Sequence, residues 1–433
     1  MQEQRKVSVR VPVLARVEGE GALELDIDNG TIANLKFSIF EPPRLFEKLL
    51  EGRNFQEVPD ITARICGICP VAYQMSAVHA AEMAFGVQIT PWARALRRLL
   101  YCGEWIQSHA LHIHLLAAPD FLGFDNALAM AKTFPHVVSR GLKLQGLGNR
   151  IMRVVGGRSV HPVNACVGGF YSAPALDEMR ALQAELEAAR ADAYELVRWV
   201  VNLPMPDDQQ DFVSVALHHP DEYPFNEGRI ISDNGLDIGI EEYAQHFNEF
   251  QMPHSTALHA HLHGKPYLVG PLARVNLLHE QLPAQLLELL AGSPVQFPSR
   301  NMFHSMAARA LEIAYSVDEA IRLLAEYSLP DQPHHVPVTT REAVGFGCTE
   351  APRGMLWHRY AFNADGTVKN ARIVPPTSQN QARMEQDLHQ SLHAFGLDNS
   401  DEALKLRAEQ VIRNYDPCIS CATHFLRLKV NRG

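Results

Sequence analysis

The chain has few cysteines and no long apolar stretch, and each shortage excludes a class of protein. Seven cysteines in 433 residues are too sparse for the disulfide framework of a small secreted protein. No apolar run approaches the roughly 20 residues that a helix needs to cross a bilayer. Residues 1–6 are charged and lack the apolar core of a signal peptide. We therefore expect a cytoplasmic protein without a membrane span.

An excess of basic residues is missing as well. The chain has 39 Lys and Arg against 49 Asp and Glu, a formal net charge of −10 that is spread along the sequence. This balance argues against non-specific binding to nucleic acid. The length is sufficient for a large globular protein with a deep core.

Two segments have the pattern of a β-hairpin. Residues 23–40 alternate between apolar and polar side chains on both sides of Asn29-Gly30, which is a strong turn signal. A second hairpin is predicted over residues 356–374. Both segments lie outside the long helical stretches, so we expect β-elements at the edges of the fold.

Helical periodicity dominates from about residue 71 onward. Apolar residues recur at three-to-four spacing in four long segments: 91–118, 174–200, 302–327 and 401–414. Segments rich in proline, glycine and histidine are predicted as irregular connections: 204–238 and 250–280. The expected fold class is mainly α with appended β-elements (α+β), arranged as a helical bundle.

The most informative feature is a pair of Cys-x-x-Cys motifs at opposite ends of the chain. One contains Cys66 and Cys69, and the other Cys418 and Cys421. Each pair can bind one metal centre, and roughly 350 residues separate the pairs, so the whole fold must close to bring them together. Four soft sulfur ligands favour zinc, an iron–sulfur cluster or a thiophilic metal such as nickel.

A closed zinc site that joins the two ends of the chain is one interpretation of these cysteines. Polar neighbours favour a reactive metal instead, because such a metal needs groups that move protons and adjust charge. Arg64 precedes the first pair, Asp416 precedes the second, and His424 follows it.

The two signatures together resemble the catalytic large subunit of nickel–iron hydrogenases. The first reads Arg-Ile-Cys-Gly-Ile-Cys-Pro over 64–70, and the second reads Asp-Pro-Cys-x-x-Cys-x-x-His over 416–424. Residues 68–74 are most similar to the cytoplasmic NADP-linked group called sulfhydrogenases. Further motifs of the family occur in the same order along the chain: Arg16-Val17-Glu18-Gly19, Arg44-Leu45-Phe46-Glu47, Gly156-Gly157-Arg158, Glu350-Ala351-Pro352-Arg353-Gly354 and Pro376-Thr377-Ser378-Gln379-Asn380.

The resemblance implies a nickel–iron centre with carbon monoxide and cyanide on the iron. All four cysteines would bind nickel, and Cys69 and Cys421 would also bridge to the iron. Cys66 and Cys418 would then be terminal ligands. A terminal thiolate keeps a lone pair and can act as a base when H2 is split.

The resemblance also implies roles for polar residues near the centre. Glu18 would be the first proton carrier, and Arg353 would lie over the open side of the metals. Asp416 would anchor Arg353 or the second thiolate loop. Thr377, beside Pro376 in a segment that the resemblance implies is a loop, would donate to a metal-bound cyanide. Ordinary surface or turn-forming roles are the alternative for each of these residues.

A second ion is implied near the end of the chain. Mg2+, or Fe2+, would bind Glu47, His424 and a backbone carbonyl, here that of Ile373. An ion pair of Glu47 with Arg44 or Arg53 is the alternative.

Two departures from the commonest family pattern stand near these motifs. Tyr73 occupies a position where many relatives have histidine, and Ser108 stands where an acidic residue often occurs. His109 and His112 are expected to be packed or hydrogen-bonded helix residues rather than metal ligands.

The resemblance implies one domain over 1–433, divided into four parts: 1–60 mixed β/α, 61–340 mainly helical, 341–380 the β-hairpin region, and 381–433 the C-terminal helices with the second cysteine pair. Nine residues follow His424. They either form a short final strand or are removed by a maturation protease after nickel chaperones have loaded the metal.

The implied activity is the reversible heterolytic cleavage of H2 to protons and electrons. The three remaining cysteines are too few for a four-thiolate cluster, and the chain has no Gly-x-Gly-x-x-Gly fingerprint. A small iron–sulfur subunit would therefore carry the electrons, and a diaphorase subunit with FAD would pass them to NAD(P). A hydrogen sensor with the same centre and a zinc-bound structural scaffold are the alternatives. A quinone-site subunit of respiratory complex I would share this fold, but such subunits lack the four cysteines, so the cysteines argue against that role.

Overall fold

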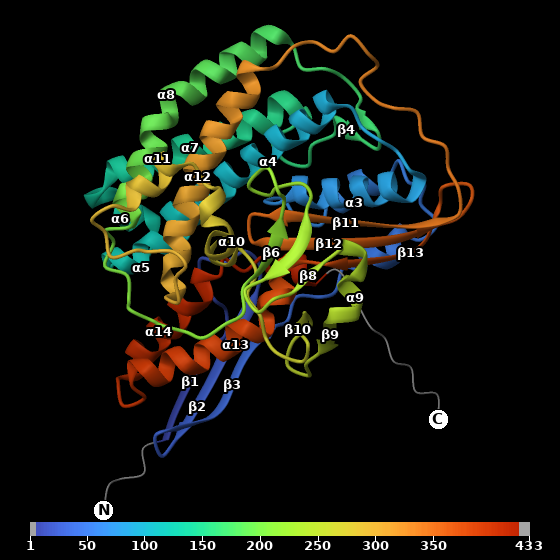
Figure 1. Ribbon diagram of the computed structural model, residues 1–433. Coiled ribbons are helices and arrows are strands. Elements are labelled where there is room, and N and C mark those ends of the chain that lie inside the picture. The colour runs from blue at the N-terminus through green and yellow to red at the C-terminus, as the bar shows by residue number, and fades with distance from the viewer. Residues whose placement is uncertain (1–5, 424–433) are drawn as a thin grey trace, which may run out of the picture.

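The computed structural model describes residues 6–423, and long helices form its framework (Figure 1). The predicted helical bundle is confirmed. It consists of four helices that pack on one another: α4 (Pro91–Leu111), α7 (Pro135–Gly156), α8 (Leu176–Val200) and α12 (Ser305–Ala325). In α8 the buried residues recur at three-to-four spacing, as the sequence predicts. This helix begins at Leu176, two residues after the start of the predicted segment, 174–200.

Shorter helices surround this framework. Those that precede α12 in the chain are α1 (Phe46–Leu50), α2 (Val58–Ala63), α3 (Pro70–Phe85), α5 (Ala118–Leu122), α6 (Ala127–Thr133), α9 (Tyr243–His246), α10 (Pro271–Leu278) and α11 (Ala284–Leu287). Those that follow α12 are α13 (Pro376–Phe395), α14 (Asp401–Asn414) and α15 (Ile419–Ala422). A π-helical turn (His112–Ala117) joins α4 to α5.

The first sheet confirms the predicted N-terminal hairpin. Strands β2 (Gly21–Asp28) and β3 (Thr31–Ile39) are antiparallel, and β1 (Lys6–Val11) pairs with β2. Asn29 and Gly30 form the turn with positive φ angles of 54° and 74°, the conformation that this pair favours in tight hairpins. The sheet contacts α13 and α14 (Figure 1).

The second sheet lies against α3. The predicted hairpin is β12 (Gly354–Phe362) with β13 (Val368–Val374), and β11 (Ala343–Ala351) joins its other edge. A Cβ atom at Gly345 or Gly347 would lie about 2 Å from a backbone oxygen of α3. Glycine at these two positions therefore allows the helix to approach the sheet closely enough to hold the first cysteine pair in place.

The two segments expected to be irregular are partly regular, which corrects that prediction. They contain small antiparallel strands and α10: β6 (Val215–His218), β7 (Arg229–Ser232), β8 (Asp237–Ile238) and β10 (Leu258–Leu262), with β9 (Phe247–Gln251) adjoining. Another pair, β4 (Ala165–Cys166) and β5 (Gly169–Phe170), also lies in the part expected to be mainly helical. Strands this short carry too few residues for a detectable alternation.

The segment Pro376–Asn380 was expected to be a loop, and it is the first turn of α13. Proline suits the first helical position because its missing N–H has no intrahelical partner there. This correction is relevant to the site, because a helix holds its side chains more rigidly than a loop.

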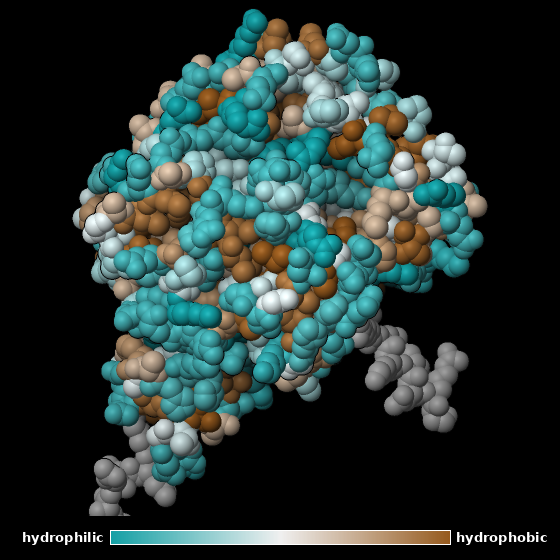
Figure 2. Space-filling view, in the orientation of Figure 1, coloured by the Kyte–Doolittle hydropathy of each residue, from teal (hydrophilic) through white to brown (hydrophobic). Residues whose placement is uncertain are grey.

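The surface is mixed rather than uniformly polar. Figure 2 shows separate hydrophobic patches among hydrophilic side chains on one face. Across residues 6–423, no helix combines the length and hydrophobicity required to cross a membrane.

Candidate metal centre

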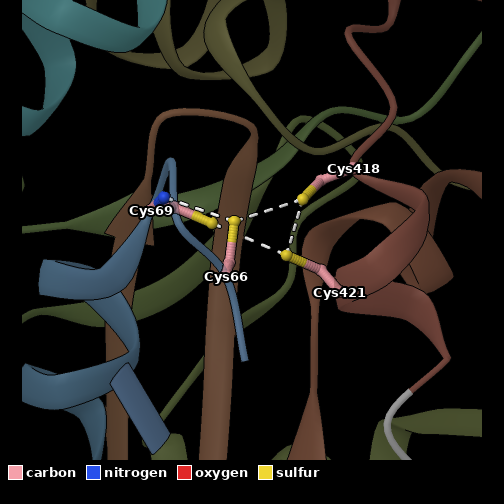
Figure 3. A group of neighbouring side chains, drawn as sticks. All are labelled: Cys66, Cys69, Cys418 and Cys421. Atoms are coloured by element: carbon pink, nitrogen blue, oxygen red, sulfur yellow. Dashed lines mark hydrogen bonds between the residues drawn. The ribbon is translucent and has the colours of Figure 1, made fainter. Parts of the chain in front are cut away.

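Two turns bring the four cysteines together. Cys66 and Cys69 lie between α2 and α3, while Cys418 and Cys421 lie at the start of α15 and within it (Figure 3). The Sγ atoms of Cys66 and Cys418 are 3.4 Å apart, those of Cys69 and Cys421 are 3.6 Å apart, and those of Cys418 and Cys421 are 2.7 Å apart. The sulfurs thus enclose one point.

The four thiols are buried, each with at most 3% of its surface exposed. Burial raises the pKa of Cys418 and of Cys421. Hydrogen bonds from the neighbouring thiols, that of Cys418 first, lower the pKa of Cys66 instead. Protein groups alone therefore do not keep all four sulfurs ionised. A soft metal ion would do so, and the donor set fits nickel.

The first pair has the backbone geometry of a metal-binding turn. The N–H groups of Ile68 and Cys69 point at the Sγ of Cys66, at 3.3 and 3.4 Å. Such donors favour the thiolate over the thiol, because they stabilise negative charge on sulfur.

Glu18 lies beside the second pair. Its carbonyl accepts the N–H of Ile419 at 3.0 Å, and its carboxylate accepts the N–H and the hydroxyl of Ser420 at 3.1 and 2.5 Å. Burial raises the pKa of Glu18, and the negative charge at Cys66 adds to this effect. Hydrogen bonds from Ser420 and Cys418 oppose the rise. Glu18 thus adjoins Cys418, with which its main chain forms a β-bridge.

Arg353 lies in the turn between β11 and β12, 3% exposed, and is held by Asp416. Its Nε donates to the carbonyl of Asp416 at 2.7 Å, and its Nη2 donates to Oδ1 of Asp416 at 3.1 Å. Its Nη1 has no hydrogen-bond partner within residues 6–423. Although burial opposes the charge, Asp416 and then the Cys418 thiolate raise the pKa of Arg353. A fixed cation with an uncommitted donor therefore adjoins the four sulfurs.

Thr377 approaches the same loop from the first turn of α13. Its Oγ1 accepts the backbone N–H of Cys418 at 3.0 Å. Because the hydroxyl oxygen is the acceptor here, this bond does not use the hydroxyl hydrogen. Pro376, the first residue of α13, fixes the start of the helix that carries Thr377.

The residues proposed for the second ion are partly described. Oε1 of Glu47, in α1, accepts the N–H of Ile373, in β13, at 2.7 Å. His424, the third proposed ligand, lies outside the described residues.

A family model described as nickel-dependent hydrogenase matches residues 44–140 and 239–424, which include all four cysteines. The chain belongs to this family. It is the catalytic subunit of a nickel-dependent hydrogenase, an oxidoreductase. The expected α+β fold is confirmed as the large-subunit fold of the nickel–iron hydrogenases by superposition on a solved member of that group.

Known relatives match this hydrogenase over nearly its full length. It is 35% identical to the sulfhydrogenase 1 subunit alpha of Pyrococcus furiosus, over 97% of this chain and 98% of that protein. It is 28% identical to the NAD-reducing hydrogenase HoxS subunit beta of Cupriavidus necator, over 95% and 94% of the two chains. A crystal structure of an NAD+-reducing [NiFe]-hydrogenase in its H2-reduced state superposes with a TM-score of 0.86, at 27% identity, covering 97% and 99% of the two chains.

A buried charge cluster behind Arg353 was not predicted from the sequence. Arg274 of α10 donates to Glu312 and Glu350, with N–O distances of 2.8 and 2.9 Å, and all three side chains are fully buried. Arg274 also donates to the carbonyls of Ala351 and Pro352. This cluster fixes the turn that carries Arg353. Glu350 lies within a family motif, but nothing near Arg274 in the sequence indicates its role.

The histidines of α4 and of the π-helical turn are hydrogen-bonded, as expected. Nε2 of His109 lies 2.9 Å from Glu312, and Nε2 of His112 lies 2.8 Å from the carbonyl of Arg413. Ser108 is buried, and its hydroxyl has no partner within residues 6–423. In this hydrogenase these residues line the interior without entering the group of four thiols.

Proposed function

We propose that this subunit cleaves H2 heterolytically and reversibly at a nickel–iron centre, with carbon monoxide and cyanide on the iron, held by the four thiolates. Cys66 and Cys418 would be terminal ligands, and Cys69 and Cys421 would bridge the two metals. The observation that carries the proposal is the convergence of four buried sulfurs beside an uncommitted arginine donor. When bound, the centre would supply Lewis-acid polarisation of H2 and a route for its electrons.

The protein would move the proton from Cys418 to Glu18. The Sγ of Cys418 would take the proton as a base, because a terminal thiolate keeps a free lone pair. Glu18 supports this route by geometry, since its main chain pairs with Cys418 and its carboxylate is oriented by Ser420. The carboxylate would then pass the proton outward.

Arg353 would keep the open side of the centre positively charged. Asp416 holds two of its nitrogens, so that Nη1 is left for the ligands or substrate at the centre. Preorganised donors of this kind need no reorganisation during the reaction. Thr377 would donate its hydroxyl hydrogen to a cyanide on the iron.

A second cation, Mg2+ or Fe2+, would bind Glu47, the carbonyl of Ile373 and His424. The support is the short contact between α1 and β13, which places the Glu47 carboxylate at the backbone of Ile373. Oxygen ligands suit Mg2+, whereas a histidine ligand also admits Fe2+.

Electrons would leave through a small iron–sulfur subunit and a flavin diaphorase that reduces NAD+ or NADP+. The remaining cysteines, Cys102, Cys166 and Cys348, lie on α4, β4 and β11 and form no metal-binding group within residues 6–423. A relative and a solved structure that are named as NAD-reducing hydrogenases support a pyridine nucleotide as acceptor.

The test of this function is infrared spectroscopy with metal analysis on the complex purified without oxygen. Bands of metal-bound carbon monoxide and cyanide are expected, together with nickel and iron. The same sample should reduce NAD+ or NADP+ with H2, and the comparison of the two identifies the acceptor. Zinc without those bands would overturn the proposal and indicate a structural site. An intact centre with very slow turnover would indicate a hydrogen sensor.

The proton route is tested with Glu18→Gln, which keeps the shape of the side chain and removes its acidity. H2-dependent activity should fall by about 10²–10⁴-fold, the usual contribution of a general acid–base group, while nickel content and the infrared bands stay unchanged. Glu20→Gln is the matched control, because Glu20 is exposed and lies two residues away. Equal activities for the two variants would exclude the route through Glu18.

A further inference from the structure

A second group of potential metal ligands lies outside the cysteine centre. His254 is in the loop between β9 and β10, His259 is on β10, and Glu385 is on α13. Nε2 of His254 is 2.7 Å from Oε1 of Glu385, and Nε2 of His259 is 3.3 Å from Oε2. Two imidazole nitrogens and one carboxylate thus converge from three segments.

The surrounding structure fixes this group. The backbone N–H of Phe37, in β3, donates to Oε1 of Glu385 at 3.2 Å. Thr256, in the loop of His254, donates its hydroxyl to the carbonyls of Ile39 and Glu41 at 3.0 and 2.9 Å. The loop, β3 and α13 are therefore tied together before any ligand binds, and a preformed site loses little entropy on binding.

The basic neighbours of the Glu385 carboxylate decide whether a cation can bind to it. Within residues 6–423, no Lys or Arg forms an ion pair with this carboxylate. The third potential ligand group in this part of the chain, His219 with Glu222 and Glu227, differs in this respect: Arg94 already lies 2.5 Å from both of its carboxylates.

The donor set and its exposure suit a transition metal. Two histidines and one carboxylate are ligands that zinc and other imidazole-binding divalent ions accept, with water in the remaining position. The side chain of His259 is 2% exposed, whereas those of His254 and Glu385 are 14% and 19% exposed. One side of the group is therefore open for an ion and its water.

We infer that His254, His259 and Glu385 bind one divalent transition-metal ion that is separate from the nickel–iron centre. The ion would join the β9–β10 hairpin to α13 (Figure 1), the helix that begins at Pro376 beside the second cysteine pair. Its role would be to fix this contact, and the inference does not depend on the proposed electron acceptor.

The test uses the anaerobically purified complex after removal of loosely bound ions with a chelator. Co2+ is added as the probe and followed by visible absorption, and Zn2+ binding is followed by metal analysis. The wild type should bind one equivalent more than Glu385→Gln or His254→Gln. That equivalent should give weak visible bands without the intense charge-transfer absorption of thiolate ligands. The midpoint of thermal unfolding should rise with Zn2+ in the wild type and not in Glu385→Gln or His254→Gln.

Loss of one ligand should weaken binding by at least the roughly 10–100-fold that loss of an outer-shell partner causes. His261→Gln is the matched control, because His261 also lies on β10 but outside the group. It should bind like the wild type. Unchanged nickel content in all variants shows that the fold is intact. Equal Co2+ and Zn2+ binding by the wild type and Glu385→Gln, or a thiolate spectrum for the extra ion, would overturn the inference.

Discussion

The four-thiol centre and the Arg274 cluster are both fully buried, but they balance their charge in different ways. In the cluster, Arg274 faces two carboxylates, and hydrogen bonds occupy nearly every polar atom. At the thiol centre, four sulfurs that would carry negative charge as metal ligands face Arg353, which Asp416 already pairs with. Buried charge is costly unless it is paired.

The difference between the two regions distinguishes a structural polar cluster from a binding site. The Arg274 cluster is complete with protein groups alone, so it stabilises the turn before Arg353. The thiol centre is incomplete with protein groups alone and would be completed by a metal. Changes in the two regions should therefore affect different properties, stability in one and metal content in the other.

The largest effect is expected at the thiol centre. Cys421→Ser replaces a soft ligand by a hydroxyl that stays protonated, so nickel content and H2-dependent activity should fall by more than about 10²-fold. Metal analysis and a viologen-linked H2 assay measure the two. Cys166→Ser, on β4 outside the centre, is the control and should keep both. Full nickel in Cys421→Ser would contradict the assignment of the centre.

In the Arg274 cluster, Glu312→Gln should act on stability. It leaves Arg274 with a much weaker counter-charge, and breaking a buried ion pair in this way costs about 3–5 kcal/mol. Denaturant unfolding of the complex measures the loss. A cost below about 1 kcal/mol would show that buried Arg274 does not need Glu312 as its counter-charge.

Glu350→Gln should cost less, about 1–2 kcal/mol, because burial raises the pKa of Glu350 to about 7 despite Arg274. The folded state therefore keeps this proton between pH 4.5 and 7, while the unfolded chain releases it. The resulting stability is present below pH 4.5 and is lost as the pH rises through 7. Unfolding curves at several pH values should show a steeper decline in the wild type than in Glu350→Gln, because the variant keeps only the similar contribution of Asp387, whose pKa burial also raises to about 7. Parallel profiles would contradict it.

The smallest effect is expected for a surface ion pair that resembles the cluster only in its charges. Lys143 and Asp192 are 2.6 Å apart, with side chains 55% and 38% exposed. Water screens such a pair, so Lys143→Ala should change the free energy of unfolding by less than about 1 kcal/mol. A cost equal to that of Glu312→Gln would show that burial does not explain the difference between the regions.

The regular elements with local signals were predictable. Asn29-Gly30 marks the first hairpin, and apolar spacing marks α8 and α12, because each signal lies within the element that it specifies. β11 and the start of α13 were missed. Strand β11 contains two glycines that interrupt the alternation of apolar and polar side chains. These glycines allow α3 to pack closely against the strand and do not themselves favour a strand.

The sequence determined the chemistry of the main centre: four sulfur ligands in two pairs, with Glu18, Arg353 and Thr377 in motifs of a known family. Cys-x-x-Cys is a local pattern, and its ligand type does not depend on the rest of the fold.

Only the tertiary structure decided which distant groups meet. It brings Cys66 to Cys418 across 352 residues, places Arg274 behind the turn of Arg353, and gathers His254, His259 and Glu385 around one point. The physical reason is range: hydrogen bonds and metal coordination require contact within a few ångströms. Sequence periodicity specifies which face of an element is buried, but not which partner it will meet there.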